Sequence, residues 1–166
     1  MNRYRSAAAL LLTLVSSAAA PRAASQSLAD LNQHPTLGDI FPGFDAQALD
    51  GSSRRLSYPK GTTTVLLFFS SGCPVCHRMI PEWNRAYERR AKGVEIVGVI
   101  VDKEPPGFFA AMPMAFPVVR LPSNDFARAN KVNRVPLTLR LLPGGRIEDL
   151  GLGVLDPIRL GELLRP

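Results

Sequence analysis

The chain contains two cysteines, Cys73 and Cys76, and only two residues separate them in the sequence Cys73-Pro74-Val75-Cys76. A disulfide bond that closes such a short loop restricts the unfolded chain little, because the entropy that loop closure removes grows with loop length. The pair is therefore poorly suited to stabilising a fold. Its spacing indicates that the two thiols either perform chemistry or hold another group.

The segments around the pair favour redox chemistry. Residues 62–69 form an apolar, β-branched run that is typical of a buried strand, and Ser70-Ser71-Gly72 ends it. A helix should begin at Cys73-Pro74, because a proline lacks the N–H that the first helical turn would leave unpaired. The free amides and the dipole of that helix end favour the thiolate of Cys73, which is the attacking species in disulfide exchange. Cys76, one turn further on, can then resolve a mixed disulfide.

Three neighbours are expected to tune this dithiol. Pro74 removes a backbone donor near the sulfur atoms, and Val75 adds no charge. His77 follows Cys76 directly, and we expect a partly exposed helix residue that modestly adjusts the reactivity of the pair.

The same residues also fit two other kinds of site. Cys73-Pro74-Val75-Cys76-His77 matches the attachment motif of a c-type haem, with His77 as one axial ligand and Met112 or Met114 as the other. A zinc ion would need two more ligands, and His34 and His77 are poorly placed for that role. Haem attachment is typical of a mostly helical chain, whereas this motif follows a buried strand. We therefore expect no haem, no metal and no other cofactor.

Strand and helix patterns alternate along the rest of the chain. Residues 94–101 predict a second buried strand, and Ile80, Trp83, Tyr87 and Ala91 recur at helical spacing and should face a core. Pro81 lies inside that helix and should kink it. We also expect a hairpin around Phe44 and Leu49, short helices at 108–114 (ended by Pro113) and 125–131 (capped by Asn124), strands at 116–121, 137–142 and 146–152, and a last helix at 157–164 capped by Asp156. The pattern predicts an α/β fold with a mixed central sheet flanked by helices and an N-terminal β extension.

The N-terminus has the pattern of an export signal. Arg3 and Arg5 precede an apolar run over residues 7–20, and small residues follow as far as Ser25. We predict a signal peptide at 1–25, a polar tether at 26–36 and one domain at 37–166. Because the run is short for a membrane span, which needs roughly 20 residues, we expect an exported, periplasmic protein. An uncleaved N-terminal anchor is the alternative.

The charge pattern excludes one class of partner. The net charge is +6, and it would fall to +3 if Arg3, Arg5 and Arg22 left with the signal. The remaining charges are scattered and form no basic stripe with interleaved aromatic residues, so we expect no nucleic-acid binding.

Residues 37–164 resemble the TlpA/ResA-type thioredoxin-like (redoxin) proteins, which are exported relatives of thioredoxin. The matching motifs, in chain order, are Leu37-Gly38-Asp39, Asp50-Gly51, Phe68-Phe69 before the two cysteines, Pro81, Val135-Pro136 and Gly144-Gly145. The resemblance implies a thioredoxin fold in which Pro136 is cis and, with Val135, lies against the dithiol and positions an extended substrate. It also implies a monomer that exchanges disulfides with protein substrates and with a membrane electron donor or acceptor.

The chain departs from that family at three positions. It has Gly72 where relatives carry a tryptophan, Leu67 at the position of thioredoxin's buried acid, and Met79 where some ResA-type proteins have an acid. A carboxylate there would accept the proton of Cys76. Without one, the proton would pass to His77, to water or to the substrate, and Glu82 and Asp102 are further candidates.

Several functions stay open at this point. The resemblance favours a reductase that supplies electrons to apocytochrome c or similar thiols, whereas a DsbA-like oxidase or isomerase and a MauD-type maturation factor would use the same residues. A peroxidase would need a hydroxyl and an arginine around a single reactive cysteine. Ser70 lies three residues before Cys73, but no proline precedes it at the usual distance. A binding module with a static bridge between the cysteines is the non-enzymatic alternative.

Overall fold

The computed structural model describes residues 33–165, so the predicted signal peptide at 1–25 and most of the predicted tether lie outside the described residues. The elements in chain order are β1 (Phe44–Ala48), β2 (Ser53–Leu56), β3 (Thr63–Phe69), α1 (Pro74–Glu88), β4 (Val94–Ile100), α2 (Phe108–Ala111), β5 (Val118–Arg120), α3 (Asn124–Ala129), β6 (Leu137–Leu141), β7 (Ile147–Leu152) and α4 (Pro157–Leu163). Within this range no helix is long and apolar enough to cross a membrane.

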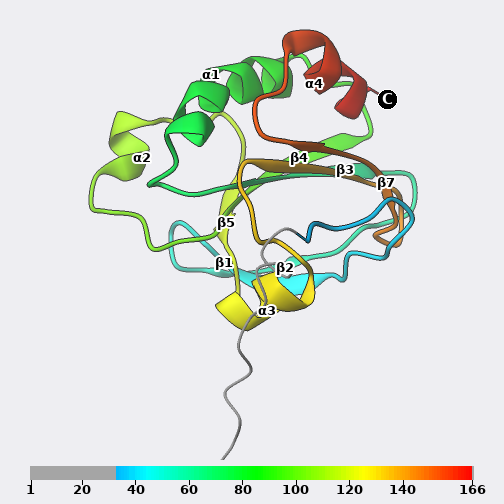
Figure 1. The fold of residues 1–166 in the computed structure, drawn as a ribbon, viewed down its shortest axis with the longest axis horizontal. Coiled ribbons are helices and arrows are strands. Elements are labelled where there is room, and N and C mark those ends of the chain that lie inside the picture. The colour runs from blue at the N-terminus through cyan, green and yellow to red at the C-terminus, as the bar shows by residue number, and fades with distance from the viewer. Residues whose placement is uncertain (1–32, 166) are drawn as a thin grey trace, which may run out of the picture.

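The strands form one sheet in the order β2-β1-β5-β4-β3-β6-β7. β3, β4 and β5 run parallel to one another, and the other pairings are antiparallel. Helices α1 and α4 cover one face of the sheet, and α3 lies on the other side (Figure 1). The predicted α/β fold with a mixed central sheet is confirmed, and β1 and β2 are the predicted N-terminal hairpin.

Strand β3 lies at the centre of this sheet and is buried on both faces. Val65, Leu67 and Phe69 pack in the cluster that includes α1 and α4, whereas Leu66 and Phe68 pack in the cluster with the N-terminal hairpin. This two-sided burial explains why the strand is a continuous apolar run rather than an alternating one. Because β3 and β4 are parallel, their carboxyl ends meet at the same edge, where the segment with the two cysteines begins.

Helix α1 starts as predicted, with Cys73 as its N-cap and Pro74 as its first residue. Pro81 lies inside the helix. Ile80 and Trp83 are buried against β3, so the expected packing role of Trp83 is confirmed. The helix ends at Glu88, and Ala91, expected on the same face, follows its end and is half-buried on the same core.

The helix α3 begins one residue earlier than predicted. Asn124 was predicted as its cap, but it is the first helical residue, and the cap is Ser123, whose Oγ accepts the amide of Phe126 at 3.1 Å. Serine and asparagine are about equally good caps, so two such neighbours leave the start undecided in the sequence. The cap of α4 agrees with the prediction, since Asp156 accepts the amides of Ile158 and Arg159.

The described part of the predicted tether contacts the domain. The carbonyl of Gln33 accepts a hydrogen bond from the Asn133 side chain at 3.4 Å, and Pro35 is buried. The amide of Gly38 then donates to the carbonyl of Ile147 at 2.9 Å, so the chain reaches the sheet beside the start of β7.

An ion pair between Asp149 and Arg159 joins β7 to α4, with Arg159 Nη1 2.8 Å from Asp149 Oδ2. The hydrogen bond from Arg159 lowers the pKa of Asp149 below its ordinary 3.8, although burial opposes the shift. The pair therefore contributes stability above pH 3.8 that is lost as pH falls through the lower folded pKa. We expect Asp149→Asn to reduce the free energy of unfolding by about 1 kcal/mol at neutral pH and by clearly less at about pH 2.5. Urea unfolding of both proteins at the two pH values measures this, and an equal difference at both would contradict it.

Candidate active site

The two cysteines are joined by a disulfide bond and differ in their access to solvent. Cys73 is half-exposed at the N-terminus of α1, whereas Cys76 is 0% exposed. The sulfur of Cys73 accepts the amide of Cys76 at 3.1 Å, which is the bond of a helix N-cap. A partner molecule can therefore reach Cys73 but not Cys76. An attacking Cys73 and a resolving Cys76 would need such a difference, and these two roles stay a prediction.

Cys76 lies in an apolar environment. Leu67 and Met79, the two positions at which the family resemblance led us to look for an acid, are 1% and 2% exposed and belong to the same buried cluster as Cys76. Apolar surroundings disfavour a charged thiolate. The candidate proton acceptor Glu82 is instead paired with Arg85 on α1.

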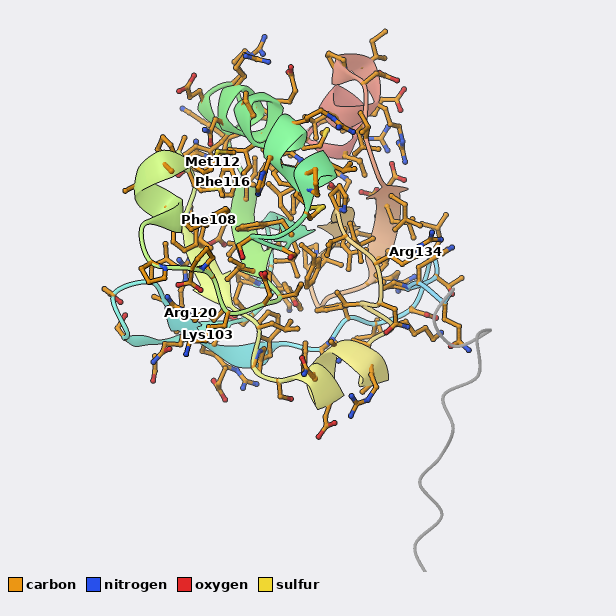
Figure 2. The ribbon with its side chains drawn as sticks, turned by 60° about the vertical axis from the view of Figure 1, so that its left-hand side comes forward. Lys103, Phe108, Met112, Phe116, Arg120 and Arg134 are labelled. Atoms are coloured by element: carbon orange, nitrogen blue, oxygen red, sulfur yellow. A yellow bond between two sulfur atoms is a disulfide. The ribbon has the colours of Figure 1, made fainter. Side chains whose placement is uncertain are left out.

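The loop before β6 lies directly beside Cys73. The peptide bond between Val135 and Pro136 is cis, as the resemblance implies. The carbonyl oxygen of Val135 is 4.0 Å from the Cys73 sulfur, and Pro136 is buried while Val135 is half-buried. Arg134, just before them, is exposed, and in Figure 2 it lies on the opposite side of the start of α1 from Phe108 and Met112. The structure thus brings residues 62 positions apart together at the reactive sulfur.

A carboxylate at the end of β4 holds the turn that precedes Cys73. Asp102 accepts hydrogen bonds from the Ser71 amide at 2.9 Å, from the Ser71 hydroxyl at 2.7 Å and from the Ser70 hydroxyl at 2.9 Å. Burial alone would raise the pKa of Asp102, but these bonds outweigh it and hold the pKa below its ordinary value. Asp102 is therefore a carboxylate at neutral pH. The hydroxyl of Ser70, which a peroxidase would need for its substrate, already donates its proton to Asp102.

His77 is fixed to the same turn. Its Nε2 is 2.8 Å from the carbonyl oxygen of Ser71, and its ring centroid is 5.8 Å from that of Phe108. Because a carbonyl can only accept, Nε2 must carry the proton and Nδ1 is the acceptor of the neutral ring. The half-exposed position on α1 agrees with the one expected for this residue.

From the sequence, Asp102 was only a candidate proton acceptor for Cys76, and Ser71 was assigned no role in the site. The available signal was the position of Asp102 directly after a parallel strand adjacent to the one that leads to the cysteines. Side chains at the carboxyl ends of neighbouring parallel strands gather at one edge of a sheet. By this rule, Asp102 and Ser71 are expected to lie close together at that edge.

The surroundings of the two cysteines differ from those that haem attachment or a zinc site would need. Haem attachment was expected in a mostly helical chain, but the motif lies between a central strand and a helix of a seven-stranded sheet. Met112 and Met114 are half-buried and pack against the core. Over residues 33–165, no three His, Cys, Asp or Glu side chains group in a way that could hold a metal ion.

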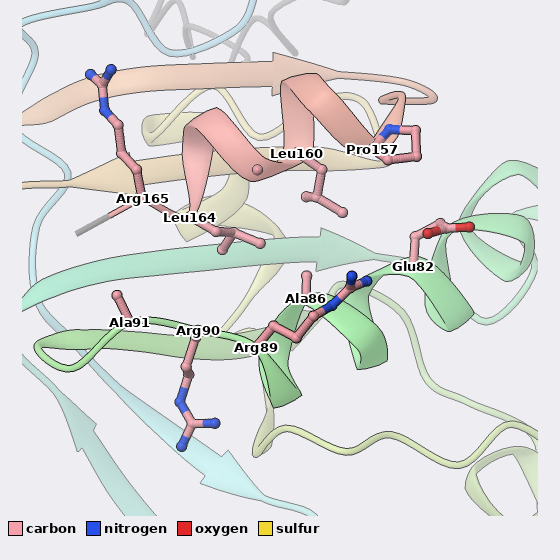
Figure 3. A pocket seen from close by; sticks show the side chains of 10 residues that line it. Glu82, Ala86, Arg89, Arg90, Ala91, Pro157, Leu160, Leu164 and Arg165 are labelled. Carbon is pink, nitrogen blue, oxygen red and sulfur yellow. The ribbon is translucent and has the colours of Figure 1, made fainter.

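A cavity of about 370 Å³ lies between α1 and α4 (Figure 3). Its lining includes Ala86, Arg89 and Leu160, and its first α1 residue is Glu82, nine positions after Cys73. At 1.5 Å of rise per residue, that is roughly 13 Å of helix away from the dithiol. The cavity is therefore separate from the site of disulfide exchange.

Relatives identify the class of protein to which this fold and dithiol belong. A model of the AhpC/TSA family matches residues 37–144. The thiol-disulfide oxidoreductase ResA of Oceanobacillus iheyensis is 30% identical over 167 aligned residues, which cover 96% of this chain and 86% of that protein. ResA of Bacillus subtilis is 27% identical over 122 residues, covering 71% of this chain and 68% of the relative.

Solved structures agree on the fold. A protein from Chlorobium tepidum, described as a candidate thiol:disulfide interchange protein DsbE, superimposes with a TM-score of 0.65 at 26% identity, covering 78% of this chain and 93% of the other. StoA from Bacillus subtilis gives a TM-score of 0.63 at 22% identity and covers 74% of this chain and 96% of StoA. The fold is that of thioredoxin-like proteins. The chain belongs to the AhpC/TSA (redoxin) family, and it is a thiol-disulfide oxidoreductase of the ResA-like type with Cys73 and Cys76 as its Cys-x-x-Cys pair.

Proposed function

We propose that this protein reduces disulfide bonds of protein substrates outside the cytoplasm, in a role like that of reductases in cytochrome c maturation. The observation that carries disulfide exchange is the unequal dithiol: a half-exposed Cys73 at a helix N-terminus, bonded to a fully buried Cys76. Such a position favours a thiolate on the accessible sulfur and protects the second sulfur from other partners. The reductase direction rests on the resemblance to ResA-type proteins.

The reaction starts from the reduced dithiol. The Cys73 thiolate attacks one sulfur of the substrate disulfide, and the other substrate sulfur leaves as a thiolate and takes up a proton. Cys76 then loses its proton and attacks the Cys73 sulfur of the mixed disulfide, which releases the second substrate thiol. Two electrons have passed to the substrate, and the protein ends with the disulfide between Cys73 and Cys76. A membrane electron donor with a dithiol of its own returns the protein to the reduced state.

Val135 and Pro136 position the substrate in this proposal. Because the Val135 carbonyl is 4.0 Å from the Cys73 sulfur, an extended peptide that pairs with the backbone of Val135 would bring its own cysteine next to that sulfur. A proline at the next position has no N–H that could compete for the peptide's carbonyls.

The location outside the cytoplasm rests on the N-terminal sequence. Residues 1–25 have the basic start, apolar centre and small-residue end of a signal peptide, with an uncleaved anchor as the alternative. The names of the ResA relatives support exchange with disulfides, and the direction of electron flow is part of the proposal. An oxidase or a MauD-type maturation factor would use the same residues in the opposite direction or with other substrates.

The reduction potential of the dithiol tests the proposed direction. We expect a reducing value, near or below thioredoxin's approximately −270 mV, when the purified protein is equilibrated with glutathione or dithiothreitol buffers and its thiols are counted by alkylation and mass spectrometry. A value near the approximately −120 mV of DsbA would contradict the reductase proposal and favour an oxidase.

A further inference from the structure

The turn that leads into α1 has few means of holding its own shape. Gly72, the residue immediately before Cys73, has no side chain, and a Cβ built there would meet only the Ser70 hydroxyl, at 3.9 Å. The turn instead closes through the amide of Cys73, which donates to the Ser70 carbonyl at 3.2 Å, and the amide of Gly72, which donates to Ser70 Oγ at 3.2 Å. The orientation of Ser70 therefore decides where Cys73 lies.

Asp102 sets that orientation from outside the turn. The Ser70 hydroxyl donates its only proton to Asp102, which leaves its lone pairs free for the amide of Gly72. The second serine gives the carboxylate two more donors, the amide and the hydroxyl of Ser71. Hydrogen bonds to a charged acceptor are shorter and stronger than neutral ones, so this carboxylate is the strongest contact that the turn makes.

The same contacts extend to the helix. With its amide and hydroxyl held by Asp102, Ser71 presents its carbonyl to His77, which donates from Nε2 at 2.8 Å. His77 lies on α1 directly after Cys76. A continuous set of hydrogen bonds thus runs from the end of β4, through the turn, to the first turns of the helix that carries both cysteines.

We propose that Asp102 is the positioning residue of the dithiol: its carboxylate holds the Ser70–Gly72 turn so that Cys73 caps α1, and through Ser71 it fixes His77 in the Nε2–H tautomer. The inference rests on the proposed function, because it concerns the reactivity of Cys73 as the attacking sulfur. Asp102 does not touch the reacting atoms, and it acts through the turn.

A second effect of Asp102 would have the opposite sign. A carboxylate near the dithiol repels a thiolate, so removing its charge alone would make Cys73 more reactive. Loss of the turn geometry would make Cys73 less reactive, because its sulfur would leave the helix N-terminus. The direction of the net change in Cys73 reactivity therefore shows which of the two effects is larger.

The test compares Asp102→Asn and Ser71→Ala with the matched control Asp45→Asn, which removes the same charge from an exposed residue of β1. Asparagine keeps the shape of Asp102, but it has one acceptor oxygen and brings an NH₂ against the donors of Ser71. Ser71→Ala keeps the carboxylate charge and removes one hydrogen bond. The rate of Cys73 alkylation by iodoacetamide at about pH 7 is measured on the reduced full chain by peptide mass spectrometry, and the His77 tautomer is read from its ring ¹⁵N shifts at about pH 8.

We expect alkylation of Cys73 to slow about tenfold in Asp102→Asn and about threefold in Ser71→Ala, and to stay unchanged in Asp45→Asn. We also expect His77 to change from one tautomer to a mixture in Asp102→Asn. Faster or unchanged alkylation in Asp102→Asn would overturn the proposal, and so would an unchanged His77 tautomer. If Asp102→Asn does not fold, an unchanged rate in Ser71→Ala overturns it. Alkylation needs no protein substrate, so a wild-type protein that fails to reduce protein disulfides would contradict the proposed function and leave this test intact.

Discussion

Replacing Cys73 with serine is expected to abolish disulfide exchange, lowering the rate by about a thousandfold or more, because the attacking sulfur is lost. Replacing Cys76 with serine should instead trap the reaction half-way. Cys73 then still attacks a substrate disulfide, but no second sulfur is present to resolve the mixed disulfide. Non-reducing gels and intact-mass spectrometry of Cys76→Ser after incubation with a protein disulfide should show a covalent adduct on Cys73.

The double variant, in which both cysteines are serines, is the control for adducts that form elsewhere. It should give none, as should Cys73→Ser. An adduct on Cys76 in Cys73→Ser at a rate similar to that of Cys76→Ser would contradict the assigned order of attack. No adduct in either single variant would contradict exchange itself and favour a binding module with a static bridge.

Replacing the buried Arg140 with methionine is expected to reduce the free energy of unfolding by about 3 kcal/mol. Arg140 lies on β6 with a side chain that is 4% exposed, and it pairs with Glu148 on β7. Its Nη1 also donates to the carbonyls of Leu163 at 3.0 Å and Arg165 at 2.6 Å, at the end of α4. The Leu163 carbonyl is one that a helix end leaves unpaired, and Arg165 follows the helix. Methionine cannot donate, so it would leave both carbonyls and Glu148 without this partner.

The matched control is Arg55→Met, which breaks the ion pair between Arg55 and Asp45 on the exposed hairpin. Its cost should stay below about 1 kcal/mol, because exposed pairs contribute little. Thermal and urea unfolding of the oxidised proteins, followed by circular dichroism, measure both. If Arg140→Met and Arg55→Met lost the same free energy of unfolding, the buried arginine would stabilise the fold no more than the exposed one, which would contradict the prediction.

The order and type of the elements could be predicted because each leaves a local signal. The run at residues 62–69 is apolar throughout because β3 is covered on both faces. Pro74 and Pro157 mark the first residues of α1 and α4, since a proline is tolerated there. The start of α3 was missed by one residue, because Ser123 and Asn124 are both good caps.

The site could be predicted only in part. The cysteines and the loop at Val135 and Pro136 are visible as motifs, but the contacts of Asp102 are not, because it lies 31 positions after Ser71 in the sequence. No local pattern encodes a hydrogen bond between two strand ends, and the pairing of β3 with β4 creates it. The burial of Arg140 was invisible for the same reason, since its partners come from β7 and from the end of α4.

A single-turnover reaction tests the claim of a redox-active dithiol most directly. The fully reduced protein is mixed with an excess of a protein disulfide, and substrate thiols and the disulfide between Cys73 and Cys76 are measured together by alkylation and mass spectrometry. We expect about two new substrate thiols for each protein molecule that gains this disulfide, with both appearing at the same rate. Cysteines that stay reduced while no substrate thiols appear, or substrate thiols that appear without the disulfide between Cys73 and Cys76, would contradict this expectation.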